Sequence, residues 1–212
     1  MSYLHIFLLL ITTLLPIIKG SKILYKEEFL KGSNDWHIIG NNNKGNGIKI
    51  ITESIYAPYS ITRGNKVIAN RYIVGDDKLI NVNPLNNKLN DANLWYFKKV
   101  FEKPLNLKDA TVLQFTLIPF VGNFTTPNLN KKNNPLVKLI SNNNLLIETV
   151  HNLFTNIDIS NGHKFNIPLI DNVIYNKTNI QDILANLKEI HILGDWTRGY
   201  EVVGLDDVIF YK

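Results

Sequence analysis

Two adjacent acids near the end of the chain, Asp206 and Asp207, are the first residues whose types could support catalysis or metal binding. They lie in the alternating run GLDDVIFYK, which is typical of a β-strand, and neighbouring residues of a strand point to opposite faces. Without a bulge the two carboxylates cannot enter one pocket, which disfavours a glycosidase pair made of these acids alone. Either one of them caps the turn after Gly204 while the other is exposed to solvent, or they bind a metal ion.

An aromatic cluster just before this strand could stack against a sugar ring. Trp196 precedes Arg198 and Tyr200 in a turn bracketed by glycines. An indole and a phenol beside a guanidinium can form a platform for carbohydrate, so Trp196, Arg198 and Tyr200 are the predicted ligand-binding residues. The alternative is that Trp196 is a hydrophobic plug closing one end of the core, in which Trp36 and Trp95 are also expected to lie.

Several common catalytic patterns are absent from the sequence. The chain has no cysteine, which excludes thiol catalysis and cysteine-ligated metals, and it has no G-x-S-x-G motif. The run GNNNKGNG at 40–47 lacks the phosphate-loop pattern and predicts a hairpin loop instead. Zinc is disfavoured because no close ligand spacing joins the widely separated histidines His37, His151, His163 and His191.

A carbohydrate hydrolase remains open, since it needs only two carboxylates about 5 to 10 Å apart in a cleft. Glu53, Glu148 and Glu201 are far apart in the sequence, but a fold can bring distant acids together. A structure without such a pair on a concave face would contradict this alternative.

The chain as a whole is organised as short strands between polar turns. Clusters of asparagine, which favours turns, separate runs rich in β-branched and aromatic residues. This spacing indicates one all-β sandwich or barrel domain, from about residue 21 to 212. The predicted strands cover residues 48–52, 70–74, 95–101, 111–120, 136–140, 145–150, 164–169, 190–193 and 204–212.

One segment has helical periodicity instead. Apolar residues at 180, 183, 184 and 187 follow the i, i+3, i+4, i+7 pattern, and Thr178 with Gln181 predicts a capping box at the start of the helix. The predicted fold is therefore all-β, a two-sheet antiparallel sandwich with one short C-terminal helix.

The first twenty residues predict export. Residues 3–18 form an uncharged apolar block that is short for a membrane span, and KGS follows at 19–21, which predicts a signal peptide cleaved near Gly20. The alternative is an uncleaved membrane anchor. After cleavage we expect no transmembrane anchor, and N-glycosylation becomes possible at Asn123 and Asn176, which fit the N-x-[ST] pattern. The net charge of +5 comes mainly from scattered lysines, which disfavours nucleic acid as a partner.

The helical segment 180–187, the strand 190–193 and the closing GLDDVIFY follow one another in an order that resembles the end of laminin IV type A (laminin B) domains. The runs LWYFKKVFEKPL and ATVLQFTL are similar to a further part of that family. The opening EEFLKGSNDWHIIGNNN resembles the start of galactose-binding-like jelly rolls. The chain departs from the laminin pattern at 98–104, where KKVFEKP replaces the family's A-P-x-K-F-L-G-D stretch.

This resemblance implies a two-sheet jelly roll in an extracellular adhesion, matrix or glycan-binding setting, without catalytic residues. Jelly rolls of the galactose-binding type often bind calcium where the first and last strands meet. The resemblance therefore also implies one structural Ca²⁺, held by Glu27 or Glu28 and by Asp206 or Asp207.

We therefore expect a secreted, non-catalytic module that recognises an extracellular glycan or glycoprotein. The alternatives are the secreted hydrolase above and a structural coat or matrix protein that binds only proteins.

Overall fold

Strands make up almost all of the regular structure in the described residues. The computed structural model describes residues 22–29, 34–41, 48–53, 55–57, 61–63, 66–69, 72–76, 95–122, 124, 135–149, 162–170, 174–175, 179–196 and 201–212. The strands in these ranges form two large antiparallel sheets and a separate hairpin of β5 (Ile61–Arg63) and β6 (Lys66–Ala69).

The six-stranded sheet is built around the last strand of the chain. β15 pairs on one side with β9, and on the other side with β7 along its first half and with β1 along its second half. The strands of this sheet are β12 (His163–Pro168), β9 (Val112–Val121), β15 (Val202–Tyr211), β7 (Tyr72–Asp76), β4 (Ile55–Ala57) and β1 (Ile23–Glu27). The first and last described strands therefore lie side by side.

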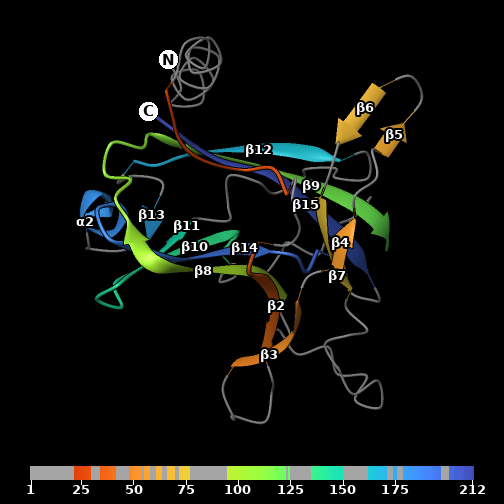
Figure 1. The fold of residues 1–212 in the computed structure, drawn as a ribbon, viewed down its shortest axis with the longest axis horizontal. Helices are drawn as coiled ribbons and strands as arrows, with labels where there is room; N and C mark the ends of the chain where they lie inside the picture. The colour runs from red at the N-terminus through yellow and green to blue at the C-terminus, as the bar shows by residue number, and fades with distance from the viewer. Residues whose placement is uncertain are drawn as a thin grey trace, which may run out of the picture.

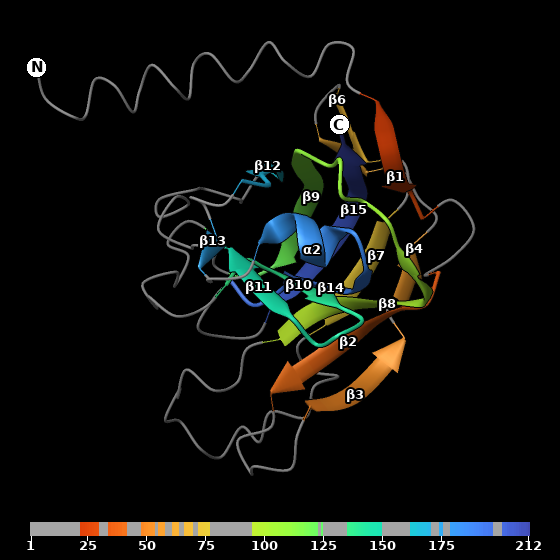
Figure 2. The same cartoon turned by 90° about the vertical axis from the view of Figure 1, so that its left-hand side faces the viewer.

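The seven-stranded sheet forms the second layer, below the six-stranded sheet in Figure 1. Its strands, in spatial order, are β13 (Ile174–Tyr175), β11 (Leu146–Thr149), β10 (Val137–Ser141), β14 (Leu187–Leu193), β8 (Trp95–Leu105), β2 (Trp36–Asn41) and β3 (Ile48–Glu53). The helix α2 (Ile180–Leu184) lies against β10 at one end of the sandwich, as Figure 2 shows.

The core fills the space between the two sheets. Alternate residues of β9, such as Leu113, Phe115 and Leu117, are fully buried, because one face of each strand points toward the opposite sheet. Trp36 and Trp95 are fully buried as predicted. These observations confirm the all-β sandwich, and within the described ranges α2 is the one short helix.

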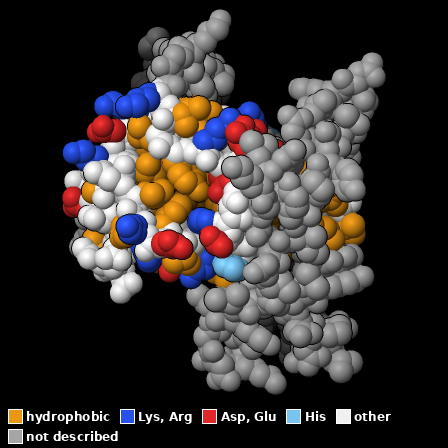
Figure 3. All heavy atoms as spheres, in the orientation of Figure 1, with side chains coloured by type: hydrophobic (Ala, Val, Ile, Leu, Met, Phe, Trp, Pro, Cys, Tyr) orange, Lys and Arg blue, Asp and Glu red, His pale blue; other side chains and the backbone are white. Residues whose placement is uncertain are grey.

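The core reaches the surface between β1 and β8. Tyr25 of β1 makes edge-to-face contacts with Phe101 of β8 and with Phe210 of β15, and Leu24 and Leu105 are only partly buried beside them. In Figure 3, hydrophobic side chains gather in the middle of this side of the molecule, with charged side chains around them. Packing of the Tyr25 ring against Phe101 and Phe210 therefore covers the core along this edge, and leaves it partly exposed.

A bulge in β15 corrects the expectation that Asp206 and Asp207 point to opposite faces of a regular strand. The register with β9 shifts between Asp206 and Ile209, and Asp207 adopts a φ of 52°. The bulge lies at the point where β15 changes its pairing partner from β7 to β1. An extra residue there allows two separate strands to share one edge of β15.

Two predicted boundaries are also corrected. β8 continues through Pro104 to Leu105, beyond the predicted end of the strand. Its register with β14 is irregular between Val100 and Leu105. Proline, which has no backbone N–H, is tolerated in this stretch because no regular inter-strand hydrogen bond is lost there. The helix cap is Asn179, whose side-chain oxygen accepts from the backbone N–H of Gln181 at 2.9 Å, one residue later than the predicted Thr178.

Candidate functional site

The predicted sugar platform is not exposed at its tryptophan. Trp196 has 1% of its surface exposed, its Nε1 donates to the Leu193 carbonyl at 3.0 Å, and its ring packs against Phe165. The prediction that this indole stacks against a ligand is wrong, because the indole lies in the core as the alternative described. Arg198 and Tyr200 lie outside the described residues.

Glu201, one of the acids considered for hydrolysis, is a structural acceptor. Its carboxylate is fully buried and accepts from Trp95 Nε1 at 3.1 Å and from the backbone N–H of Trp196 at 3.0 Å. A carboxylate enclosed in this way satisfies core donors and has no exposed surface for a substrate.

The other two acids considered for hydrolysis lie at opposite sides of the seven-stranded sheet. Glu53 is on β3 and Glu148 is on β11, and four strands separate these two in the sheet. Five inter-strand spacings correspond to about 24 Å between their backbones, well beyond the separation of a glycosidase pair. Glu148 also forms an ion pair with Lys138 at 3.3 Å.

The four predicted calcium ligands do lie near one another, because β1 and β15 pair, with Glu27 opposite Val208. Asp206 is 4% exposed, and burial, followed by the charge of Asp207, raises its pKa to about 7. This value includes a smaller raising effect of the Glu28 charge and the lowering effect of a backbone hydrogen bond at Asp207.

Two of these acids have other partners. Glu27 accepts from the Asn34 amide at 2.6 Å, and Glu28 pairs with Lys26. Within the described part of the chain, no group of three or more His, Asp or Glu side chains is arranged to hold a metal ion. Calcium binding therefore stays a prediction for experiment.

A row of polar residues crosses the outer face of the seven-stranded sheet. Direct cross-strand neighbours share a face, and the registers place His37 opposite Lys98, Lys98 opposite His191, His191 opposite Lys138, and Lys138 opposite Glu148. We call His37, Lys98, His191, Lys138 and Glu148 the transverse row. It spans five adjacent strands, from β2 to β11.

Strand alternation places this row on the side away from the core. The residues beside His191 and Lys138, namely Ile190, Ile192 and Leu139, are fully buried members of the core cluster. Their polar neighbours must then point outward. The side chains of Lys98 and Lys138 are 16% and 26% exposed, so these two members of the row can be reached from solvent, whereas His191 between them is 4% exposed.

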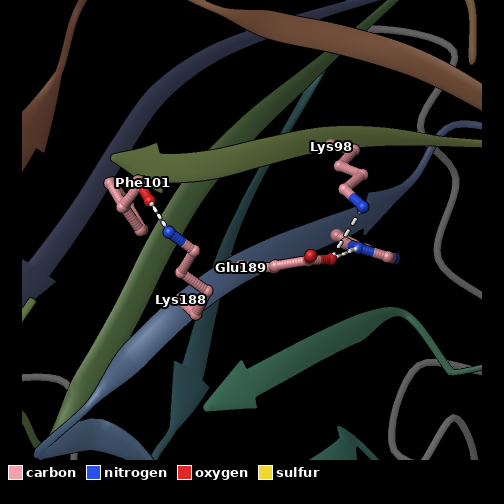
Figure 4. A network of polar contacts seen from close by, with 5 residues as sticks. Lys98, Phe101, Lys188 and Glu189 are labelled. Atoms are coloured by element: carbon pink, nitrogen blue, oxygen red, sulfur yellow. Dashed lines mark hydrogen bonds and ion pairs between the residues drawn. The ribbon is translucent and has the colours of Figure 1, made fainter. Parts of the chain in front are cut away.

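Glu189 connects the centre of the row. Its carboxylate pairs with Lys98 at 2.8 Å and with His191 Nε2 at 2.9 Å (Figure 4). Burial raises the pKa of Glu189, but the hydrogen bonds from Lys98 and His191 outweigh it and hold the pKa below its ordinary value. The preceding residue, Lys188, points instead toward β8 and donates to the Phe101 carbonyl at 2.6 Å.

His191 is neutral near pH 7 in this arrangement. Burial lowers its pKa, and the positive charges of Lys98 and Lys138 lower it further, although the hydrogen bond to Glu189 opposes this. A neutral imidazole can donate through one nitrogen and accept through the other. The centre of the row is therefore an uncharged, buried imidazole that lies between two lysines and is held by Glu189.

Tyr96 lies beside the row with its hydroxyl buried. Lys138 Nζ is 5.0 Å from the centre of the Tyr96 ring, which is 7% exposed. Burial, followed by the charges of Glu148 and Asp195, raises the pKa of Tyr96, so the phenol stays protonated. Among the described residues its Oη has no hydrogen-bond partner, and the same holds for Nδ1 of His37. Buried polar atoms without partners are uncommon and can mark a place where a ligand binds.

Sequence reasoning missed this site. There His191 was considered only among the histidines that are too widely separated for zinc, and Lys98 only as part of the run KKVFEKP at 98–104. The alternation of polar and apolar residues from Glu189 to Ile192 was the available signal. It shows that one face is polar, but it does not show which strands lie next to it.

The remaining predicted features lie outside the described residues. These are the apolar segment 1–20 and the sequons at Asn123 and Asn176. In the parts of the chain that are described, no helix has the length and apolarity needed to cross a membrane.

The comparisons with known proteins show the fold. No protein-family model and no curated protein sequence matches the chain. The structure is similar to the L4b domain of human laminin alpha-2, with a TM-score of 0.54 and 11% identity over 88% of this chain and 96% of that one. The two-sheet jelly roll implied by the laminin resemblance is therefore confirmed.

Two further solved structures are similar. An exo-beta-agarase matches with a TM-score of 0.52 and 11% identity over 89% of this chain, which corresponds to 25% of the agarase chain. A carbohydrate-binding module studied for specific mannan recognition matches with a TM-score of 0.45 and 14% identity, over 91% of this chain and 98% of that one.

Proposed function

We propose that this protein is a secreted, non-catalytic module that binds an extracellular glycan or glycoprotein through the outer face of its seven-stranded sheet. The observation that carries the proposal is the transverse row, with the Tyr96 hydroxyl beside it, which has no hydrogen-bond partner in the part of the chain that the structure describes. The similarity in fold to the laminin alpha-2 L4b domain supports an extracellular binding setting, in line with the apolar segment at residues 3–18.

The charges of the row favour a neutral ligand. Lys98 is paired with Glu189, and Lys138 is paired with Glu148, so the positive charges are compensated within the face. A strongly anionic ligand would have to displace these pairs. Sugar hydroxyls, which donate and accept, can instead bond to carboxylates, ammonium groups and the Tyr96 phenol together.

The positions of the acids support a role without catalysis. Glu201 is enclosed in the core, and Glu53 and Glu148 lie on strands too far apart to share a glycosidic bond. The proposal also includes cleavage near Gly20, one domain at 21–212, and surface glycans at Asn123 and Asn176.

The test uses the mature chain 21–212 on a glycan array, followed by calorimetry with the best neutral oligosaccharide. The double variant Lys98→Met, Glu189→Gln removes the central pair without leaving an unpaired charge. Lys108→Met, at an exposed lysine in the loop after β8, is the matched control. We expect binding to fall at least about tenfold in the double variant and to stay unchanged in the control.

Three outcomes would contradict the proposal. Unchanged binding in the folded double variant would remove the row as the site. Absence of glycan binding in a folded wild-type sample would favour the alternative of a coat or matrix protein that binds only proteins. Release of reducing sugar from bound oligosaccharide would favour the hydrolase.

A further inference from the structure

A second apolar cluster lies on the outer face of the six-stranded sheet. Tyr72 and Ile118 are buried and pack together with Val74, separately from the main core. Gly204 lies between them in the sheet, since its direct neighbours are Val74 on β7 and Ile118 on β9. Directly paired residues share a face, so the cluster surrounds a position without a side chain.

The ring of Phe120 covers this glycine. A Cβ at Gly204 would lie 2.8 Å from Phe120 Cε2 and 3.2 Å from Tyr72 Cδ2, so both rings rest against its backbone. The two ring centres are 5.2 Å apart with an angle of 30° between the planes. Phe120 is nevertheless 41% exposed. The ring is thus held from below by the sheet and from the side by Tyr72, with the rest of its surface open to solvent.

The chemistry of this patch suits a sugar ring. The described side chains around Phe120 and Gly204, namely Tyr72, Val74 and Ile118, carry no charge. One immobilised aromatic ring is too small an area for a stable protein–protein interface. An aromatic ring of this size matches the apolar C–H face of a single pyranose unit. The partial negative charge on the ring face attracts the C–H groups of the sugar.

We propose that Phe120, supported by Tyr72 and Gly204, is a second carbohydrate contact on the sheet opposite the transverse row. The ligand class rests on the proposed function, but the site is a different one. With contacts on both outer faces, one domain would hold two glycan chains and cross-link them, as an adhesion or matrix module requires.

The experiment is calorimetry of the mature chain with mannohexaose, cellohexaose and neoagarohexaose, combined with amide NMR titration. Phe120→Ala removes the ring, Phe120→Leu keeps an apolar side chain without a π face, and Ile170→Ala, at another exposed apolar residue, is the control. For at least one sugar we expect two sites per wild-type chain and saturable shifts of the Gly204 and Tyr72 amides. Both Phe120 variants should weaken one site about fivefold to tenfold, and Ile170→Ala should leave both unchanged.

The outcomes separate this inference from the proposed function. One site per chain that is lost in Lys98→Met, Glu189→Gln and unaffected by Phe120→Ala overturns the second contact and leaves the first. Full binding by Phe120→Leu also overturns it, because stacking on an aromatic face would then not be involved. A site that disappears only in the Phe120 variants supports this inference and contradicts the proposed role of the row.

Discussion

At the scale of single residues, the position of Trp95 shows how closely the core is packed. Its indole N–H donates to Glu201, and its ring lies directly against the backbones of Gly75 and Gly194. Because neither glycine has a side chain, the six-membered part of the indole can lie where a Cβ would otherwise be. The backbone hydrogen bond from Gly194 N–H to the Trp95 carbonyl, at 3.0 Å, fixes this approach.

Substitution Gly194→Ala should destabilise the fold, because the new methyl group would overlap the Trp95 ring. We expect the free energy of unfolding to fall by about 1 to 3 kcal/mol or more, as for other overpacked cores. Urea unfolding followed by tryptophan fluorescence measures the change, with Asn166→Ala at an exposed position of β12 as the control. A loss below about 0.5 kcal/mol would contradict the described packing.

The raised pKa of Asp206 predicts that the stability of the fold depends on pH between about 4 and 7. Burial raises its pKa from 3.8 to about 7, so between these values the folded protein binds a proton that the unfolded chain has released. Its contribution to stability is therefore present below about pH 4, is lost as the pH rises toward 7, and stays lost above that. We expect this single group to account for about 1 to 4 kcal/mol.

The variant Asp206→Asn should remove this dependence. Relative to wild type it should become progressively more stable from pH 4 to pH 8, in calcium-free buffer with a chelator. Thermal unfolding of both proteins across this range gives the difference. A difference that does not change with pH would show that the Asp206 carboxyl titrates normally.

At the scale of elements, α2 is a short helix whose stability depends on its cap and on its packing against the sandwich. It has five residues, and its buried positions Ile180, Ile183 and Leu184 attach it to the sandwich. Helices of this length are unstable in isolation, so packing and capping must hold it. The strand β14 begins three residues after the helix ends, at Leu187, and carries Glu189 and His191 into the transverse row. The helix therefore helps to fix the start of the strand that forms the centre of the candidate site.

Replacing the cap by Asn179→Ala should cost about 0.5 to 2 kcal/mol, because the N–H of Gln181 loses its acceptor. Asn179→Asp keeps an acceptor and should retain most of the stability. Asn186→Ala, at an exposed asparagine just beyond the helix, is the control for the loss of an amide. Equal stability of the Ala and Asp variants at residue 179 would show that the cap has no energetic role.

At the scale of the whole molecule, the ends of the described chain hold each other in place. β1 pairs with the second half of β15, and the backbone N–H of Lys212 donates to the Lys22 carbonyl at 2.9 Å. The acids Glu28, Asp206 and Asp207 lie at this junction, and after burial, which is the largest cause, the charges of Asp207 and Glu28 also raise the pKa of Asp206. A cation bound there would relieve the repulsion and tie the two ends together.

We therefore expect calcium to stabilise the mature chain at pH 8. With a Kd in the range of extracellular modules, about 0.1 to 1 mM, 10 mM Ca²⁺ should add about 1 to 3 kcal/mol and raise the Tm. The increase should disappear with chelator and in the double variant Asp206→Asn, Asp207→Asn. An unchanged Tm in wild type at 10 mM Ca²⁺, or an equal rise in the double variant, would contradict a structural calcium site at these acids.

Local patterns in the sequence predicted much of the fold. Alternation in 111–120 predicted β9, and the spacing of Ile180, Ile183 and Leu184 predicted α2, because each pattern repeats the geometry of its own element. The β15 bulge was not predictable, since it follows from the pairing of two separate strands with one edge. The burial of Trp196 depends on Phe165 and Glu201, which the sequence does not mark as its neighbours.

The sequence by itself determined the fold class, the burial of Trp36 and Trp95, and the absence of thiol and phosphate-loop chemistry, because composition and short-range periodicity decide these features. Only the tertiary structure decided the candidate site. His37, Lys98, His191, Lys138 and Glu148 come from five strands spread over more than a hundred residues, and their alignment depends on strand order and register. A shift of one residue in any pairing would turn that strand's contribution to the opposite face, and no local pattern in the sequence encodes the pairing.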